Sequence, residues 1–242
     1  MNMQMRHDEL WLSPKYYADA TTKALRQWFS DPVAKPLSLK NFIYPDKALA
    51  LGAALQEIRN WQRNFSIITS ECDVQGVDER TWNATEPSRR WNRHDKSIPG
   101  ADLSNWSNLS QDANEVIVDA FIFLFGEHGM KAWLERVTGF SIGQATCEVV
   151  RYQPGDFLAA HSDTHDNRCI GLNIYLDHLW KPGDGGLLNY KNDQNQTIAI
   201  EPMFNTASVF PVRFGCVHWV ERWNSDRLGR QTISLSYAPN QS

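Results

Sequence analysis

The chain has 242 residues, of which 42% are hydrophobic and 21% are charged, and it carries a formal net charge of −4 at pH 7. These values are typical of a globular protein with one domain or at most two small ones, and the acidic balance disfavours nucleic acid as a partner. The most apolar run, residues 116–125, contains Asp119 and is shorter than the ~20 residues that span a bilayer, so no membrane partner is expected.

The first 140 residues predict a helical region with short strands between the helices. The expected elements are a helix over 14–29, a strand over 37–43, a helix over 44–59, a strand over 61–69, a helix over 113–126 and a helix over 131–136. Ser13 and Pro14 favour the start of the first helix, as its N-cap and first residue. The helix over 113–126 has apolar residues at helical spacing and is expected to be buried and to end at Gly126.

The segment over 71–112 has the least regular pattern of the chain. It contains several tryptophans and a basic cluster over 89–94. A loop of this length within a compact domain is usually functional or disordered, so two interpretations stand: a solvated surface excursion, or a mobile lid over a substrate. Arg90 and Trp91 in this segment, with Trp180 further along, are the candidates for substrate contact.

From residue 142 onward the sequence predicts short β-strands separated by turns. The expected strands cover 145–152, 168–176, 187–190, 197–201, 207–210, 216–220 and 231–237. Strands of this length and spacing are typical of a sandwich or barrel. The chain is therefore expected to be mainly β with helical additions.

The cysteines form no CxxC pair and no short-spaced framework. They are Cys72, Cys147, Cys169 and Cys216. Three of them fall in predicted strands, where a free cysteine behaves as a small hydrophobe. Reduced thiols, together with an N-terminus that lacks the apolar run of a signal peptide, indicate a cytoplasmic protein.

Three residues of the C-terminal half form a candidate metal site. His161 and Asp163 follow a predicted strand, and residues two apart on an extended chain point to the same side. His218 lies in another predicted strand. Two imidazoles and one carboxylate make a facial triad that leaves open positions on Fe(II). A His-x-Asp pair is common by chance, so the assignment depends on the residues around it.

Two further strands carry polar faces suited to an anionic ligand. Arg230 opens one of them and shares a face with Ser234 and Ser236. An arginine at the mouth of a polar strand face suits bidentate capture of a carboxylate. The strand over 168–176 has small and polar residues on one side, where Tyr175 offers a hydroxyl.

In their order and spacing these motifs resemble the Fe(II)/2-oxoglutarate-dependent dioxygenases, with the prolyl 4-hydroxylase and hypoxia-factor prolyl-hydroxylase-like group as the nearest branch. The motifs are YxPG, HxD, RxxxxxxYLD, GG, HxV and GRxxxxxSY, within residues 145–238. The resemblance implies a double-stranded β-helix, or jelly-roll, core over 141–238. It also implies that helices within 1–140 support this core, in a single domain over 1–242.

The resemblance further implies the roles of individual residues. The implied Fe(II) ligands are His161, Asp163 and His218. The implied 2-oxoglutarate-binding residues are Arg230, Tyr175, Tyr152 and Ser234. Arg230 and Tyr175 would contact the distal carboxylate of this co-substrate. Dioxygen is the other co-substrate, and ascorbate is a candidate stimulant.

Some residues depart from the family pattern. Arg230 stands where collagen-type enzymes use Lys, which favours the hypoxia-factor-like or small-molecule branches. Arg230 also lies twelve residues after His218, a few residues more than the family pattern has. Related halogenases replace the metal carboxylate with a small residue, so Asp163 favours hydroxylation. Asp177, at the end of the YLD motif, is interpreted as a turn or surface carboxylate.

The function indicated is hydroxylation of an unactivated C–H bond of a prolyl or other residue in a protein or peptide. The alternative is oxidation of a small molecule, such as a free amino acid or a natural-product intermediate. A nucleic-acid demethylase is disfavoured. Such enzymes carry an RxxxxxR motif after the last His, and this chain has Ser236 at the position of the second Arg. A non-catalytic metal-binding barrel is the alternative from another class of protein. The sequence indicates no oligomeric state.

Overall fold

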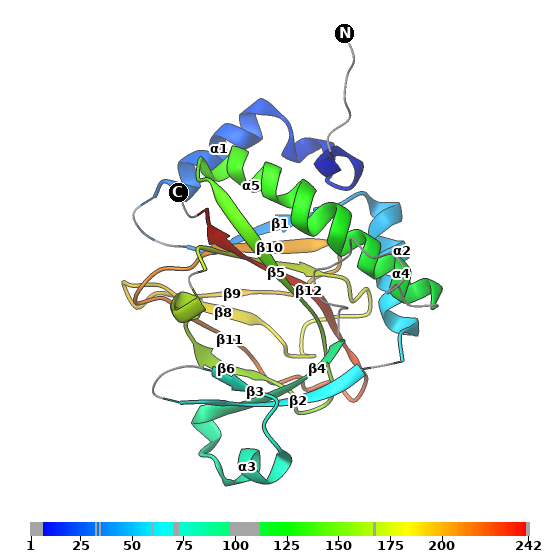
Figure 1. Ribbon diagram of the computed structural model, residues 1–242, viewed down its shortest axis with the longest axis vertical. Helices are drawn as coiled ribbons and strands as arrows, with labels where there is room; N and C mark the ends of the chain where they lie inside the picture. The colour runs from blue at the N-terminus through cyan, green and yellow to red at the C-terminus, as the bar shows by residue number, and fades with distance from the viewer. Residues whose placement is uncertain are drawn as a thin grey trace.

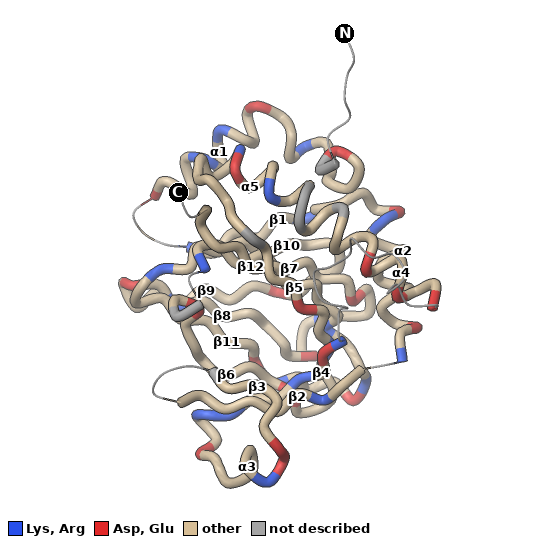
Figure 2. The backbone as a smooth tube through the Cα atoms, in the orientation of Figure 1, with Lys and Arg blue, Asp and Glu red and all other residues tan. Residues whose placement is uncertain are grey.

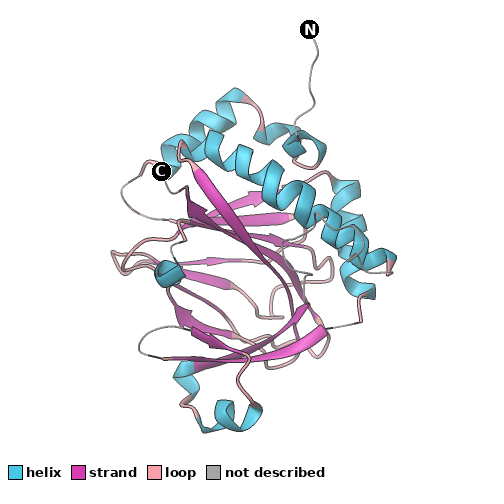
Figure 3. Cartoon of the chain, viewed as in Figure 1, coloured by secondary structure: helices cyan, strands magenta, loops and turns pink. Residues whose placement is uncertain are grey.

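Two antiparallel sheets face each other in the computed structural model of the chain, and most of the helices cover the outer face of the larger sheet (Figure 1; Figure 3). The structure describes residues 7–31, 33, 35–59, 61–69, 73–96, 112–166 and 168–240. The expected mainly β fold, with a jelly-roll core and helices from the N-terminal part, is confirmed.

In the described part of the chain the larger sheet has eight strands and the smaller one has four. The larger sheet contains, in spatial order, β1 (Leu37–Lys40), β10 (Thr206–Pro211), β7 (Ile170–Tyr175), β12 (Gly229–Pro239), β5 (Ile142–Tyr152), β4 (Arg90–Lys96), β2 (Trp61–Ile68) and β3 (Asp73–Gln75). The smaller sheet contains β6 (Leu158–His161), β11 (Val217–Val220), β8 (Leu188–Lys191) and β9 (Thr197–Ile200). The strands expected from residue 142 onward are all present, with bounds shifted by a few residues.

Alternation along β5, β7 and β12 gives the larger sheet one apolar face and one polar face. On the outer face Leu172 pairs with Leu235, and both side chains are buried in the hydrophobic cluster under the helices. On the inner face Ser234 lies between Asn173 on β7 and Glu148 on β5. The apolar face therefore stabilises the fold, and the polar face is left to line the space between the sheets.

The helical elements lie mainly in the N-terminal part. They are η1 (His7–Leu10), η2 (Pro14–Tyr16), α1 (Asp19–Phe29), α2 (Pro45–Glu57), α3 (Glu79–Ala84), η3 (Pro87–Arg89), α4 (Ala113–Phe121), the π-helix η5 (Ile122–Gly129), α5 (Met130–Thr138) and η6 (Asp163–Asp166). The helix expected over 14–29 is divided into η2 and α1. Both α1 and α2 pack against the helices that follow β4 in the chain (Figure 1).

One expected boundary among the helices is wrong: α4, η5 and α5 run on without a break, so no helix ends at Gly126 (Figure 1). A Cβ at Gly126 would lie 3.1 Å from Leu235 Cδ2, so the glycine lets the helix approach the sheet closely. The carbonyl of Gly126 accepts a hydrogen bond from the Tyr237 hydroxyl at 2.8 Å. The π-helical turn allows this carbonyl to bond outside the helix.

The expectation of irregular structure over 71–112 is also wrong, for residues 73–96. β4 lies antiparallel between β2 and β5, and α3 precedes it. Trp91 and Arg93 face the space between the sheets. Charged residues thus occupy inward as well as outward positions of β4, and the alternation of apolar and polar residues that marks a strand is absent. Residues 97–111 of the suggested lid lie outside the described residues.

The distribution of charge, the state of the cysteines and the hydropathy of the helices can each be compared with expectation. Basic and acidic residues are interspersed along the described chain (Figure 2). Among the described residues Cys147, Cys169 and Cys216 are in no disulfide, and Cys72 lies outside the described residues. No helix within the described residues combines the length and the apolarity that crossing a membrane would take.

Candidate active site

Neighbouring strands of the smaller sheet carry the two histidines of the candidate metal site. β6 and β11 pair antiparallel with His161 directly opposite His218, and the ring centroids lie 4.2 Å apart. β6 ends at His161, and the chain then turns into η6, which begins at Asp163. Asp163 therefore reaches the two histidines from a turn, and not from the extended chain that the sequence suggested.

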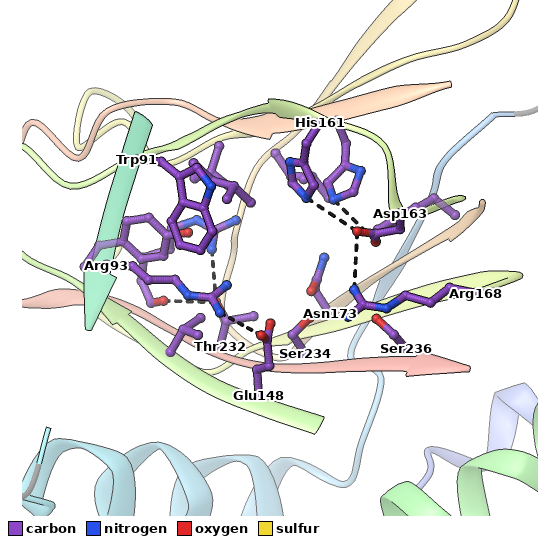
Figure 4. Close-up of a pocket in the computed structure, with 18 of the residues that line it drawn as sticks. Trp91, Arg93, Glu148, His161, Asp163, Arg168, Asn173, Thr232, Ser234 and Ser236 are labelled. Carbon is purple, nitrogen blue, oxygen red and sulfur yellow. Dashed lines mark hydrogen bonds and ion pairs between the residues drawn. The ribbon is translucent and has the colours of Figure 1, made fainter. Parts of the chain in front are cut away.

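The side chains of His161, Asp163 and His218 converge on one point (Figure 4). Nε2 of His161 lies 3.5 Å from Oδ1 of Asp163, and Nε2 of His218 lies 3.8 Å from Oδ2. The three ligand atoms all lie within 4.8 Å of one another. This spacing allows a single divalent cation to contact all three.

The protonation states of these side chains also fit a cation. His161 Nδ1 lies 2.9 Å from the Ala159 carbonyl, so we assign the proton to Nδ1, and Nε2 presents its lone pair towards Asp163. Burial lowers the pKa of His218 from 6.5 to about 3, which makes its imidazole neutral at neutral pH. Burial opposes the charge of Asp163, but the interactions with His161 and His218 hold the pKa of that carboxyl well below its usual range. Two neutral imidazoles and a carboxylate are a donor set that Fe(II) accepts.

Arg168 is a neighbour of the site to which the sequence analysis gave no role. Its Nη1 lies 3.3 Å from Asp163 Oδ1, and its charge contributes to the low pKa of Asp163. Arg168 opens the RxxxxxxYLD motif on the loop between η6 and β7, so its position seven residues before Tyr175 was the available signal. We infer that it orients the carboxylate.

A cavity of about 120 Å³ lies between the two sheets beside the triad. The polar inner face of β5, β7 and β12 forms one wall, and β4 forms another (Figure 4). Side chains from these two walls are Trp91, Arg93, Glu148, Tyr152, Asn173, Thr232, Ser234 and Ser236. The smaller sheet contributes apolar side chains, including Leu188 and Val220. The cavity is thus largely polar on the side of the larger sheet.

Arg230 lies deep in this cavity, where 3% of the residue is exposed. It has a left-handed φ of 49° at a bulge in the pairing of β12 with β5. Its Nε donates to the Gly186 carbonyl at 2.6 Å, and its guanidinium lies over the rings of Tyr152 and Tyr175, 4.8 and 5.4 Å from their centroids. The guanidinium is therefore held in one orientation by a carbonyl and two aromatic rings.

A buried carboxylate fixes the backbone at Arg230. Asp177 Oδ2 accepts hydrogen bonds from the Arg230 backbone N–H at 2.7 Å and from Arg227 Nη1 at 2.8 Å, and Oδ1 accepts one from the Leu179 N–H at 3.0 Å. Arg227 also donates to Asp184 at 3.1 Å. Asp177 begins the turn that follows β7, as expected, but it is 1% exposed, so its interpretation as a surface carboxylate is wrong.

The other candidates for 2-oxoglutarate binding lie around the same cavity. Tyr152 and Ser234 line it. Tyr175 is buried, its hydroxyl lies 2.9 Å from Ser208 Oγ, and its ring faces Arg230. Burial raises the pKa of both tyrosines, so that their hydroxyls stay protonated and can donate hydrogen bonds.

The candidates for substrate contact are separated by the structure. Trp91 lines the cavity, and its Nε1 is buried without a hydrogen-bond partner among the described residues. Arg90 donates to two backbone carbonyls, each at 2.9 Å, and Trp180 Nε1 donates to the Gly185 carbonyl at 3.0 Å. Of the three, the structure therefore brings Trp91 to the cavity and places Arg90 and Trp180 elsewhere.

A comparison with protein families gives a match over most of the chain. The family model described as oxoglutarate and iron-dependent oxygenase degradation C-term matches residues 5–213. The matched range includes His161 and Asp163 and ends before His218 and Arg230. No curated protein sequence is significantly similar to the chain.

Several solved structures share the fold at low sequence identity. A prolyl hydroxylase from Trichoplax adhaerens, in complex with a hypoxia inducible factor oxygen degradation domain peptide, gives a TM-score of 0.62 at 16% identity over 91% of this chain and 90% of that one. A Pseudomonas putida prolyl-4-hydroxylase gives 0.53 at 18% identity over 91% and 94%. The non-heme, alpha-ketoglutarate-dependent epimerase SnoN from nogalamycin biosynthesis gives 0.57 at 12% identity over 91% and 81%. At these identities the likeness establishes the fold alone.

Proposed function

The chain belongs to the oxoglutarate and iron-dependent oxygenases, and on that premise we propose that it hydroxylates an unactivated C–H bond of a prolyl or other residue in a protein or peptide. The observation that carries the proposal is one cavity with His161, Asp163 and His218 on its wall and Arg230 deep inside it. The peptide substrate is supported by the likeness in fold to prolyl hydroxylases, one of which is solved with a peptide.

His161, Asp163 and His218 would hold the iron. With 2-oxoglutarate and dioxygen, bound iron supplies the oxidation of C–H bonds, which no side chain performs by itself. The chain contributes the position of the donors. The β6–β11 pairing fixes both imidazoles, the Ala159 carbonyl sets the tautomer of His161, and Arg168 holds the Asp163 carboxylate.

Arg230 would bind the distal carboxylate of 2-oxoglutarate. Because Gly186 and the rings of Tyr152 and Tyr175 already orient the guanidinium, little freedom is lost when the carboxylate binds. The Tyr175 hydroxyl and Ser234 would add neutral donors. Charge-assisted hydrogen bonds in a buried cavity are stronger than those in water, so this end would anchor the co-substrate.

The domain organisation of the chain, its cellular compartment and its stimulant are also proposed. The helical region over 1–140 and the core over 141–238 would form a single domain over 1–242, in the cytoplasm, with ascorbate as a stimulant of turnover. Free thiols in the described core are compatible with a reducing compartment. A single urea transition, coincident in tryptophan fluorescence and far-ultraviolet circular dichroism, would support the single domain, and two separate transitions would contradict it.

A second candidate substrate is a small molecule, such as a free amino acid or a natural-product intermediate. The observation that favours it is the cavity itself, which measures about 120 Å³ and carries the charged side chains of Arg93, Glu148 and Arg168 on its walls. The likeness in fold to an epimerase of nogalamycin biosynthesis is compatible with this candidate.

The proposal is tested by incubating the iron-loaded protein and 2-oxoglutarate with a peptide library and, separately, with free amino acids and other small metabolites. Mass spectrometry reads the gain of one oxygen atom, and succinate is measured in parallel. A gain in a peptide residue supports the proposal, and a gain confined to small molecules selects the second candidate. Asp163→Ala is the control: oxygen gain that persists in this variant would mean that the triad is not the metal site.

A further inference from the structure

The wall of the cavity formed by β4 and β5 presents a carboxylate to the space beside the metal ligands. Glu148, on the inner face of β5, lines the cavity, and its side chain is 34% exposed. Figure 4 shows the carboxylate directed into the cavity, on the opposite side from His161 and Asp163. The roles proposed above for the metal site and the 2-oxoglutarate site do not use this residue.

Glu148 and Asp95 together carry one negative charge more than the guanidinium that they share. Arg93 Nη2 donates to Glu148 Oε1 at 2.8 Å, and Arg93 Nε lies 2.7 Å from Asp95 Oδ1, so a single guanidinium is shared between two carboxylates. Arg168 forms its ion pair with Asp163. Burial opposes the charge of Glu148, but Arg93 and, more weakly, Arg168 hold its pKa below the ordinary value, so the carboxylate is ionised at neutral pH.

An ionised carboxylate has more acceptor positions than this arrangement fills. Among the described residues Arg93 is the one side chain that hydrogen-bonds Glu148, and it does so through Oε1 alone. In the open cavity water can solvate the remaining positions. A substrate that covers the cavity displaces this water, and a carboxylate left without donors is then strongly unfavourable. A substrate that supplies a cationic nitrogen satisfies both the hydrogen-bonding positions and the excess charge.

We propose that Glu148, oriented by Arg93, binds a protonated nitrogen of the substrate, so that the oxidised C–H bond belongs to a compound or side chain that bears an ammonium or guanidinium group. This inference rests on the proposed function, because it places the metal and 2-oxoglutarate in the same cavity. Asn173, Ser234 and Ser236 continue the polar wall beside Glu148, so this side of the cavity offers a hydrocarbon substrate little apolar surface.

A structural role for the same residues gives a different expectation. β4 pairs with β5 from His94 to Lys96, and the Arg93–Glu148 ion pair adds a diagonal side-chain link between the two strands. If that link only stabilised the sheet, replacing Glu148 would lower the melting temperature without changing which ligand binds. Ligand selectivity therefore separates the two roles.

The experiment uses the full chain loaded with Mn(II) and 2-oxoglutarate without oxygen, and two small probes of nearly equal shape. The probes are n-propylguanidinium, which is cationic, and N-propylurea, which is neutral. The paramagnetic relaxation that Mn(II) causes in the probe protons reports binding close to the metal and requires no turnover. The proteins compared are wild type, Glu148→Gln, Glu148→Met and the matched control Glu57→Gln, which removes an exposed carboxylate from the end of α2.

We expect wild type and Glu57→Gln to bind the guanidinium probe about tenfold or more tightly than the urea, as the loss of one charge-assisted hydrogen bond predicts. Both Glu148 variants should lose this preference while they retain Mn(II) and 2-oxoglutarate. Equal binding of the two probes by wild type, or a preference that survives in Glu148→Gln and Glu148→Met, would overturn the inference and leave the proposed function intact. Failure of wild type to bind Mn(II) would overturn both.

Discussion

Replacing Asp177 by Asn tests how the protein orients Arg230, since Asp177 touches neither the cavity nor the metal ligands. Its two oxygens accept hydrogen bonds from the Arg230 and Leu179 backbone N–H groups and from the Arg227 guanidinium. Asn has the same shape but no charge, and one of its two positions is a donor. Whichever way the introduced amide is turned, its NH₂ group faces a donor: the Leu179 N–H at one position, or the Arg230 N–H and the Arg227 guanidinium at the other.

The expected magnitude follows from these contacts. A hydrogen bond to a charged group contributes roughly 1.5–3 kcal/mol, and leaving a buried donor unsatisfied costs a similar amount. The Arg227 side chain is 25% exposed, so solvent screens its ion pair and that contact is discounted. We expect Asp177→Asn to lower the free energy of unfolding by about 2–4 kcal/mol. Because the bulge at Arg230 loses its anchor, the affinity for 2-oxoglutarate should fall as well.

The assay is urea unfolding together with anaerobic 2-oxoglutarate titration of the Fe(II)-loaded protein. Asp193→Asn, which changes an exposed carboxylate in the turn between β8 and β9, is the matched control and should alter neither quantity beyond the ~0.5 kcal/mol typical of surface substitutions. If Asp177→Asn behaves like this control in both measurements, the carboxylate does not hold Arg230 in place and the reasoning is refuted.

Three further predictions concern the cavity. Arg230→Met should weaken 2-oxoglutarate binding by roughly a hundredfold, because a charge-assisted pair is lost, while Fe(II) binding measured by equilibrium dialysis stays intact; unchanged affinity would move the carboxylate site elsewhere. Burial lowers the pKa of His218 from 6.5 to about 3. The folded metal-free protein therefore binds fewer protons than the unfolded chain between these values, and its unfolding free energy should fall as the pH drops through that window, with a shallower slope in His218→Asn. Gly171→Ala would place a Cβ 2.3 Å from the Phe210 ring, so thermal unfolding should show a loss of about 1–3 kcal/mol, and an unchanged melting temperature would contradict the packing described.

The clustering of His161, Asp163 and His218 could be predicted from the sequence because its signal is local. His161 and Asp163 are two residues apart, and His218 lies in a short strand whose alternation is readable. The register that sets His161 opposite His218 is not written in either strand alone, and a shift of one residue would turn one of the two side chains to the other face. The same local pattern located Arg230 and the polar face of β12.

The residues that the sequence analysis missed are ordinary charged residues whose partners lie far along the chain. Asp177 and Arg227 are 50 residues apart, and Arg93 and Glu148 are 55 apart. No spacing rule connects such pairs, since the fold alone brings them together. β4 was missed for a related reason: its inward positions hold Arg93 and Asp95, of which Arg93 pairs with Asp95 and with Glu148 on β5, and these charges conceal the alternation of a strand.

Gly126 shows the opposite error. The rule that glycine often ends a helix is correct in general, but packing against the sheet overrides it here. Glycine often ends a helix, but here its missing side chain allows close approach to Leu235, and the helix continues as a π-helical turn. Tertiary contacts decide such a position, and a single sequence does not contain them.

The central claim is that His161, Asp163 and His218 form an iron site in the cavity that also binds 2-oxoglutarate. The most direct measurement is anaerobic titration of the Fe(II)-loaded protein with 2-oxoglutarate, followed by the visible metal-to-ligand charge-transfer band. We predict a band that saturates with 2-oxoglutarate in the wild type and is absent in a folded His161→Ala variant. A folded, iron-loaded wild type that gives no band, or a band that persists in His161→Ala, would contradict the claim.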